Sequence, residues 1–153
     1  MKSENIYLWA FNVLRYDKLR KLPGCSGLQD LYAVKLDQAF IRQIGYILKI
    51  PQENLLIDSE VTGAVVNQRY KELMKKSMTF KKEKTPHLYI VYCGGHGCSS
   101  EEKQIFLLNE DDRVKAKFPI EFKFRMLSKN YGARLCCIFD CCRVAIENQI
   151  TPA

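Results

Sequence analysis

The sequence predicts a single α/β domain whose mostly parallel sheet is covered by helices on both faces. Short, nearly all-apolar runs alternate with longer segments of helical periodicity along the 153 residues. Strands that are apolar on both of their faces are typical of parallel sheets between two layers of helices. The order strand, helix, strand, helix, strand, helix, strand therefore indicates parallel strands joined by helical crossovers.

The first half of the chain is predicted to hold two strands and two helices. The Pro and Gly residues that follow the first apolar run are typical of a loop. Two later segments show amphipathic helical spacing, with Thr62 and Ser59 as candidate N-caps of the second. The predicted elements are a strand at 6–11, a loop at 12–27, a helix at 28–48, a strand at 55–57 ending at Asp58, and a helix at 61–78. The apolar stripe of the first helix is Leu28, Leu31, Tyr32, Phe40, Ile44, Ile47 and Leu48, and that of the second is Val66, Tyr70, Leu73 and Met74.

The second half of the chain is predicted to hold the clearest strand of the sheet, at residues 87–93. This strand stops at the segment Gly94-Gly95-His96-Gly97. Pro119 near its start and Gly132 just past its end are typical of a helix over residues 118–131. The remaining elements are a short strand or hairpin arm at 104–108 and a buried strand at 135–139 that ends in Asp140-Cys141-Cys142-Arg143.

Charge and hydropathy exclude several classes of function. Hydrophobic residues make up 47% of the chain, but no segment approaches the roughly 18 consecutive apolar residues of a transmembrane helix. The N-terminus lacks the cleavage pattern of a signal peptide, so we expect a soluble, cytoplasmic protein without a membrane partner. The net charge is +7, and residues 71–84 contain six Lys and two Glu. Only Phe80 is interleaved there for base stacking, so a solvated helix end and loop is favoured over a nucleic-acid surface.

Seven Cys residues are spread over the chain, at positions 25, 93, 98, 136, 137, 141 and 142. An odd count without a secretory signal argues against a disulfide framework. Zinc sites favour Cys pairs about two to four residues apart, whereas four of these Cys form two adjacent doublets and only two His are present. We therefore expect most of them to be small buried hydrophobic residues, and no metal or other cofactor.

Two predicted strands end in residues that together suit nucleophilic catalysis. Functional groups in open α/β sheets gather beyond the carboxyl ends of the strands, so neighbouring strands would bring His96 and Cys142 together. A Cys thiolate is a nucleophile, and a nearby imidazole can take its proton and later protonate a leaving amine. The amides of Gly97 and Cys142 are candidate oxyanion donors. Each motif is weak by itself, because a lone His after a strand is more often structural and a buried Cys doublet is more often part of a core.

Four segments of the chain resemble the caspase-like cysteine peptidases, and the metacaspases and paracaspases more than the true caspases. Residues 92–97, Tyr-Cys-Gly-Gly-His-Gly, resemble the strand and Ser-Gly-His-Gly segment of that family. Residues 105–109 resemble the small strand after it, and residues 138–143, Ile-Phe-Asp-Cys-Cys-Arg, resemble the Asp-x-Cys segment in its paracaspase form. The resemblance runs over residues 6–148 and implies a three-layer fold of the large-subunit kind.

The resemblance implies that His96 is the general base and Cys142 the nucleophile of a cysteine endopeptidase acting on a protein or peptide substrate. Cys141 is the main competitor for the role of nucleophile. Asp140 would lie in the S1 pocket. Residues 22–30 resemble the family's loop before its first helix, where the family often carries an Asp near that pocket, so Asp30 is a second candidate carboxylate. The alternative for Asp30 is a helix N-terminal residue favoured by the dipole. Because carboxylates attract basic side chains, the resemblance implies cleavage after Arg or Lys.

Two departures from the family leave alternatives open. Gly94 stands where the family has Ser, and only eleven residues follow Cys142, whereas the family continues with further strands. We therefore expect residues 1–153 to form one large-subunit domain that is incomplete at its C-terminus. The alternatives are a fragment, a second chain that supplies the missing strands, and an inactive caspase-like module that binds or regulates a related peptidase. A nucleotide-binding flavodoxin-like domain is disfavoured, because residues 11–15 contain no glycine.

Overall fold

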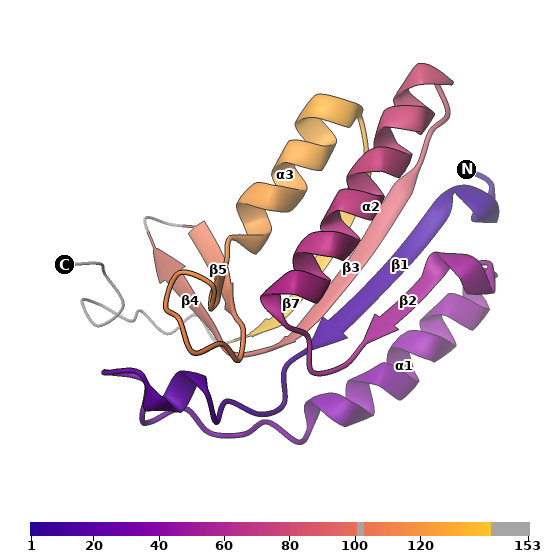
Figure 1. Ribbon diagram of the computed structural model, residues 1–153. Helices are drawn as coiled ribbons and strands as arrows, with labels where there is room; N and C mark the ends of the chain where they lie inside the picture. Colours follow the sequence, from indigo (N-terminus) through magenta and orange to yellow (C-terminus); the bar gives the residue numbers. More distant parts are fainter. Residues whose placement is uncertain (101–102, 142–153) are drawn as a thin grey trace.

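The main sheet of the computed structural model has four strands in the order β2-β1-β3-β7 (Figure 1). The structure describes residues 1–100 and 103–141. Each neighbouring pair in this sheet is parallel, which confirms the mostly parallel sheet that the sequence predicts. The strands are β1 (Ile6–Asn12), β2 (Leu55–Asp58), β3 (Leu88–Gly95) and β7 (Arg134–Cys141).

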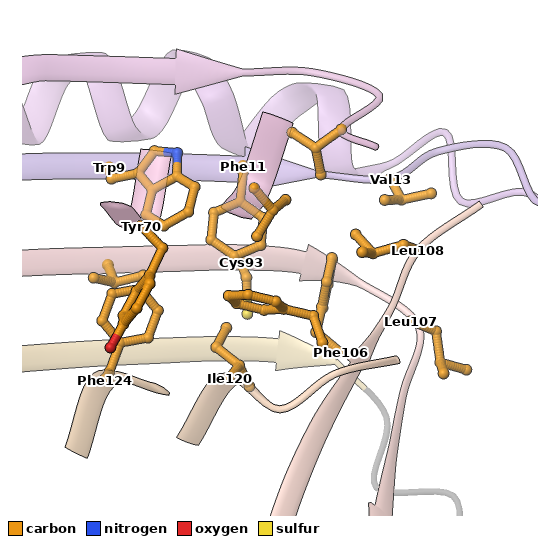
Figure 2. Packing of buried hydrophobic residues seen from close by; sticks show 14 of the residues in the cluster. Trp9, Phe11, Val13, Tyr70, Cys93, Phe106, Leu107, Leu108, Ile120 and Phe124 are labelled. Atoms are coloured by element: carbon orange, nitrogen blue, oxygen red, sulfur yellow. The ribbon is translucent and has the colours of Figure 1, made fainter. Parts of the chain in front are cut away.

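Helices cover both faces of the sheet, as predicted from the apolar strands. Helix α1 (Val34–Ile47) packs Ile41 against Leu8 and Ile90 on one face. Helices α2 (Gly63–Lys82) and α3 (Ile120–Tyr131) lie on the other face. Their buried side chains surround Trp9 and Phe11 of β1 (Figure 2). Among the helices that the structure describes, none combines the length and apolar character needed to span a membrane.

Helix α1 begins later than the predicted residue 28. The six residues before it are held by the loop after β1 instead. Leu31 donates its backbone N–H to the carbonyl oxygen of Leu14 at 2.7 Å, and the Asp30 side chain accepts from the N–H of Tyr16 at 3.1 Å. A backbone N–H that bonds to a distant loop is not available for a helical turn. The helical spacing of this segment was therefore a wrong indication, and α1 starts at Val34.

The predicted buried stripe of α1 is also partly wrong. Phe40 and Ile47 are 62% and 74% exposed, whereas Ile41 is buried and is the residue that faces the sheet. Gly45 lies on this inner side, where an added Cβ would be 3.1 Å from the Leu55 side chain. Glycine thus allows α1 to approach β2 closely. The helix contains apolar residues on two sides, so periodicity alone did not identify the side that contacts the sheet.

The two predicted helix ends on the other face are confirmed. Thr62 caps α2, because its side-chain oxygen accepts from the backbone N–H of Val65 at 3.4 Å. The helix continues past the predicted residue 78 to Lys82. Helix α3 ends at Gly132, which has a left-handed φ of 70° that glycine adopts without strain.

A small antiparallel sheet lies beyond the carboxyl end of β3. It consists of β4 (Gly97–Ser100), β5 (Lys103–Leu107) and β6 (Lys117–Phe118). The predicted hairpin arm at 104–108 corresponds to β5, while β4 and β6 were not predicted. Phe106 of β5 packs edge-on against Phe11 of β1 at 5.3 Å between ring centroids, which joins the two sheets in one core.

Strand β7 is not the fully buried strand that its apolar sequence predicts. Its residues alternate between exposed and half-buried, and Ile138 is 43% exposed. Cys136, which was expected in the core, is also exposed. β7 ends the strand order, and α1 packs on the neighbouring strands β1, β2 and β3. The described part of the chain therefore leaves one face of β7 uncovered.

A buried polar network lies at the amino end of β3. His87 is 2% exposed, and its ring stacks on Phe80 with centroids 4.8 Å apart. Its Nδ1 lies 3.2 Å from the carbonyl oxygen of Thr85, which can only accept, so Nδ1 carries the proton of the neutral ring. Nε2 then accepts from Ser77 Oγ at 3.3 Å, and Ser77 Oγ lies 2.8 Å from Tyr89 Oη. Burial lowers the pKa of His87 below its usual value, because the interior penalises the imidazolium.

We expect His87 to make folding sensitive to acid. Its pKa is lower in the folded state, so the unfolded chain binds the proton first as the pH falls below about 6.5. Its contribution to stability is complete above that pH and is lost below it, by at most about 1.4 kcal/mol per pH unit. Urea unfolding at about pH 7.5 and pH 5.5 measures this loss. The His87→Gln variant should lose less stability over this interval than the wild type, and an equal loss in both proteins would contradict the assignment.

Candidate active site at the carboxyl ends of β3 and β7

His96 follows β3 directly, beside the carboxyl end of β7. The two strands are parallel neighbours, as the sequence argument required, and their register pairs Gly95 with Cys141. The partner proposed for His96 is the next residue after Cys141. Cys142 lies outside the described residues, so its part of the site remains a prediction. The described half of the site comprises His96, the loop that holds it, the end of β7 and the carboxylates near that end.

The His96 ring is oriented by a backbone carbonyl group. Its Nε2 lies 2.8 Å from the carbonyl oxygen of Gln29. A carbonyl oxygen only accepts hydrogen bonds, so a neutral His96 ring must carry its proton on Nε2. Nδ1 then keeps the free lone pair and is the nitrogen that can accept a proton. A fixed tautomer with an orienting partner on the opposite nitrogen is the arrangement that a general base requires.

Tyr16 contacts both the backbone and the ring of His96. Its hydroxyl oxygen accepts the His96 backbone N–H at 2.7 Å, and the two rings lie 4.6 Å apart. Tyr16 is fully buried, and this burial raises the pKa of its hydroxyl well above the usual value. The hydroxyl thus stays protonated and neutral in the folded protein. The backbone N–H of Tyr16 bonds to Asp30, so one loop holds both His96 and that carboxylate.

Gly95 allows the close packing around His96. A Cβ at this position would lie 2.7 Å from Tyr16 Oη and 2.9 Å from the ring of Phe106. Both neighbours are buried and cannot move away easily. Only glycine therefore fits at position 95 without moving these side chains. Gly97, the predicted oxyanion donor, is the first residue of β4 and is paired with Phe106, and its role remains a prediction.

Cys141, the competitor for the nucleophile role, is held against other side chains of the interior. Its Sγ accepts a hydrogen bond from Gln104 Nε2 at 3.5 Å. It also contacts the thiol of Cys93, whose pKa is raised first by burial and then by Cys141 itself. The raised pKa keeps the Cys93 thiol protonated, so Cys141 lies against a neutral thiol. The surroundings of Cys141 thus resemble those of a core thiol.

Asp140 belongs to a cluster of two carboxylates and one phenol. Tyr92 Oη lies 2.6 Å from Asp37 Oδ2 and 3.1 Å from Asp140 Oδ2. A hydroxyl has a single proton, so it can donate to only one of these carboxylates at a time. Burial and the two carboxylates raise the pKa of Tyr92 and keep it protonated. Asp140 itself is exposed, so its carboxylate is accessible to a ligand.

Asp30, the second predicted carboxylate, has a different set of partners. Its Oδ1 forms an ion pair with Arg20 Nη2 at 3.1 Å. It precedes α1 by several residues and therefore does not take the helix N-terminal position that was its alternative. The hydrogen bonds of Asp30 go to Tyr16 and Tyr32, whereas Asp140 bonds to Tyr92. Within the described ranges, no three His, Cys, Asp or Glu side chains come close enough to hold a metal ion.

Three contributors to this site were not predicted from the sequence. Gln29 acts through its main-chain oxygen, which any residue type would supply. Tyr16 is 80 positions away from His96 in the chain, in a segment predicted only as a loop. Asp37 was part of a predicted amphipathic helix, where acidic residues are common on the solvent side. Only the observed start of α1 at Val34 places Asp37 in the first turn of the helix, beside Tyr92.

Comparisons with known proteins leave the function to be argued from these residues. No model of a known protein family matches the chain, and no curated protein sequence matches it either. The described geometry contributes an oriented imidazole, a neighbouring strand end with a Cys doublet in its sequence, and an exposed carboxylate near that end.

Proposed function

We propose that this protein is a cysteine endopeptidase of the caspase and metacaspase type, with His96 as general base and Cys142 as nucleophile. The observation that carries the proposal is the His96 ring, which follows β3 where Gly95 pairs with Cys141 and whose Nε2 is engaged by the Gln29 carbonyl. The single accepting nitrogen is then Nδ1. His96 comes directly after Gly95, and Cys142 comes directly after Cys141 in the sequence. Gly95 and Cys141 are paired in β3 and β7, so each reactive residue follows one member of that pair.

In the proposed first step, Nδ1 of His96 takes the proton of the Cys142 thiol. The thiolate attacks the carbonyl carbon of the scissile peptide bond, which forms a C–S bond and moves the carbonyl electron pair to oxygen. The backbone amides of Gly97 and Cys142 are the candidate donors to this oxyanion. Collapse of the intermediate breaks the C–N bond, and the imidazolium of His96 returns its proton to the leaving amine.

In the second step, water hydrolyses the thioester. His96 takes a proton from the water, and the resulting hydroxide attacks the acyl carbon. The C–S bond then breaks, the imidazolium of His96 returns its proton to the Cys142 sulfur, and the carboxylic acid product leaves. No oxidant, reductant or metal is needed for either step, because only protons and acyl groups are exchanged.

Asp140 supports a preference for substrates with Arg or Lys before the scissile bond. Its exposed carboxylate lies at the same strand end as the proposed nucleophile. A second carboxylate, Asp37, reaches the same Tyr92 hydroxyl, so this end of the sheet is acidic although the chain carries a net charge of +7. Asp30 already binds the guanidinium of Arg20, so a substrate would have to displace that side chain to use it.

Peptide hydrolysis with matched variants tests the proposal. Fluorogenic peptides with Arg, Lys or Asp before the cleaved bond are offered to the wild type, Cys142→Ala and Cys141→Ala. We expect hydrolysis after Arg and Lys only, a loss of about 10³-fold or more in Cys142→Ala, and a change within about threefold in Cys141→Ala. Wild-type protein that cleaves none of the peptides, or equal activity in Cys142→Ala, would contradict the proposal.

A second candidate function is an inactive module of the same type that binds a related peptidase. The exposed face and free edge of β7 in the described chain favour it, since an unpaired edge accepts a further strand. This function predicts no hydrolysis by the chain alone and a stable complex with an active peptidase of that type. Co-purification of the two proteins, with a measured effect on the partner's activity, distinguishes it from the first candidate.

A further inference from the structure

The outer edge of β7 is a free strand edge in the part of the chain that the structure describes. β7 is the last strand in the order β2-β1-β3-β7, and it is the pale yellow strand that lies outermost in Figure 2. Its eight residues are as many as those of β3 beside it. Long edge strands with apolar residues are templates for pairing with another strand.

The backbone groups on this edge belong to the odd-numbered residues of β7. Arg134 donates its N–H to the carbonyl oxygen of His87 at 3.1 Å, so its backbone groups point toward β3. The direction of the N–H and C=O groups alternates from one residue to the next along a strand. The N–H and C=O groups of Leu135, Cys137 and Phe139 therefore point outward.

A second copy of β7 fits this edge in antiparallel orientation. Hydrogen-bonded pairs form only where outward-pointing residues stand opposite one another, so odd-numbered residues must face odd-numbered residues. With Cys137 opposite Cys137 of the second copy, Leu135 stands opposite Phe139 and Phe139 opposite Leu135. Each of these three pairs exchanges two N–H to C=O bonds. The two-fold axis then runs perpendicular to the sheet and through the Cys137 pair.

Charge selects this register over its neighbours. With Cys137 on the axis, the side chains of Arg134 and Asp140 from opposite copies face each other at both ends of the pair. Cys136 then stands opposite Ile138 on the same, exposed face. A shift by two residues in one direction puts Asp140 opposite Cys136, and a shift in the other direction puts Arg134 opposite Ile138. Only the central register forms two ion pairs, and opposite charges at facing positions stabilise a strand pair.

The other face of the edge offers space for the partner's apolar side chains. A cavity of about 290 Å³ lies between α3 and β7, lined by Glu121, Phe124, Arg125 and Ser128 of the helix and by Leu135, Cys137 and Phe139 of the strand. The three β7 residues are only half-buried in the single chain. In the central register, Leu135 and Phe139 of the second copy lie beside this cavity and cover the same apolar surface.

We infer that β7 is a self-association edge, through which two copies of this chain join their four-stranded sheets into one continuous sheet. The inference shares Asp140 with the proposed substrate pocket, but it is tested by association and not by hydrolysis, so its failure and that of the proposed function are separate results. Two positively charged copies repel each other, and one strand pair is a small interface. We therefore expect a weak dimer, with a dissociation constant on the order of 10–100 µM.

A charge-swap series in sedimentation equilibrium tests the inference. Asp140→Arg places two Arg residues at each end of the strand pair, and Arg134→Asp places two Asp residues there. We expect each single variant to weaken the dimer by about tenfold or more, and the double variant Arg134→Asp/Asp140→Arg to return to within about threefold of the wild type. Glu53→Arg is the control variant. Glu53 is exposed and lies just before β2, at the opposite edge of the sheet, and its replacement makes the same charge change as Asp140→Arg, so we expect association to stay unchanged.

Cysteine cross-linking fixes the register without relying on the folding of charge variants. Opposite residues of an antiparallel pair lie about 4.5–5.5 Å apart at Cα, which a disulfide can span. Diamide oxidises the two Cys137 thiols to one disulfide and is itself reduced to the hydrazine, taking up two protons and two electrons. We expect a covalent dimer in the wild type and in Cys136→Ser, but not in Cys137→Ser.

Three results would overturn the inference. The first is a wild-type protein that remains monomeric at about 1 mM, well above the expected dissociation constant. The second is a double charge-swap variant that associates no better than the single variants. The third is a covalent dimer that depends on Cys136 and not on Cys137, since that dimer belongs to the register with Cys136 on the two-fold axis.

Discussion

Replacing His96 by alanine is expected to lower kcat/KM for Arg and Lys peptides by about 10²- to 10⁴-fold, provided that the proposed peptidase activity is present. The loss follows because His96 is the proposed acceptor of the Cys142 thiol proton. His96 has its Nε2 on the Gln29 carbonyl and its backbone on Tyr16 Oη, so only Nδ1 is available for the reaction. Steady-state kinetics of the purified variant measures the effect.

The second histidine of the chain provides the matched control for this prediction. His87 is buried at the amino end of β3, at the opposite end of the strand from His96. The His87→Gln variant removes an imidazole of the same kind and should change kcat/KM of the folded protein by less than about threefold. Equal losses in the two variants would show that the effect of His96→Ala comes from folding, and no loss in His96→Ala would contradict its role.

Replacing Trp9 by alanine is expected to destabilise the protein by about 3–5 kcal/mol, the cost of removing a large aromatic side chain from a packed core. Trp9 is 1% exposed and lies between Phe11 and Phe124, with ring centroids at 4.4 and 5.9 Å (Figure 2). Its Nε1 donates to Asp58 Oδ2 at 3.0 Å. Urea unfolding followed by circular dichroism measures the change, since this is the only Trp in the chain.

The Trp9→Phe variant separates packing from hydrogen bonding at the same position. Phenylalanine keeps most of the aromatic contact but loses the indole N–H, while Asp58 keeps its two bonds to Arg69 at 3.1 and 3.3 Å. We expect a loss of about 1–3 kcal/mol, clearly smaller than that of Trp9→Ala. A loss of less than about 1 kcal/mol in Trp9→Ala would show that the core around β1 is not tightly packed.

The order of strands and helices could be predicted because it depends on local patterns. Apolar runs such as 6–11 and 87–93 became β1 and β3, and the Gly132 end of α3 and the Thr62 cap of α2 lie where the sequence indicated them. These signals depend on the residues of one segment and their neighbours, so no knowledge of the rest of the fold was needed. That β3 and β7 are neighbours was a condition of the predicted site, and the structure meets it.

The start and inner side of α1 could not be predicted, because they depend on contacts with distant segments. The bond from the Leu31 N–H to Leu14 and that from Tyr16 to Asp30 keep the preceding residues out of the helix. The side of the helix that is buried was decided by the approach of Gly45 to Leu55. Helical periodicity describes one segment alone, and two of its sides carried apolar residues.

The sequence by itself determined the α/β class, the mostly parallel direction of the strands and the position of His96 after a strand, because these depend on residue type and spacing. Only the tertiary structure decided which nitrogen of His96 is free. The group that engages Nε2 is the backbone carbonyl of Gln29, which every residue type has, so the sequence does not indicate this contact. The tertiary structure also decided that β7 has an exposed face and edge, although its apolar sequence predicts a buried strand. Burial is a property of what packs against a strand, and no pattern within the strand contains that information.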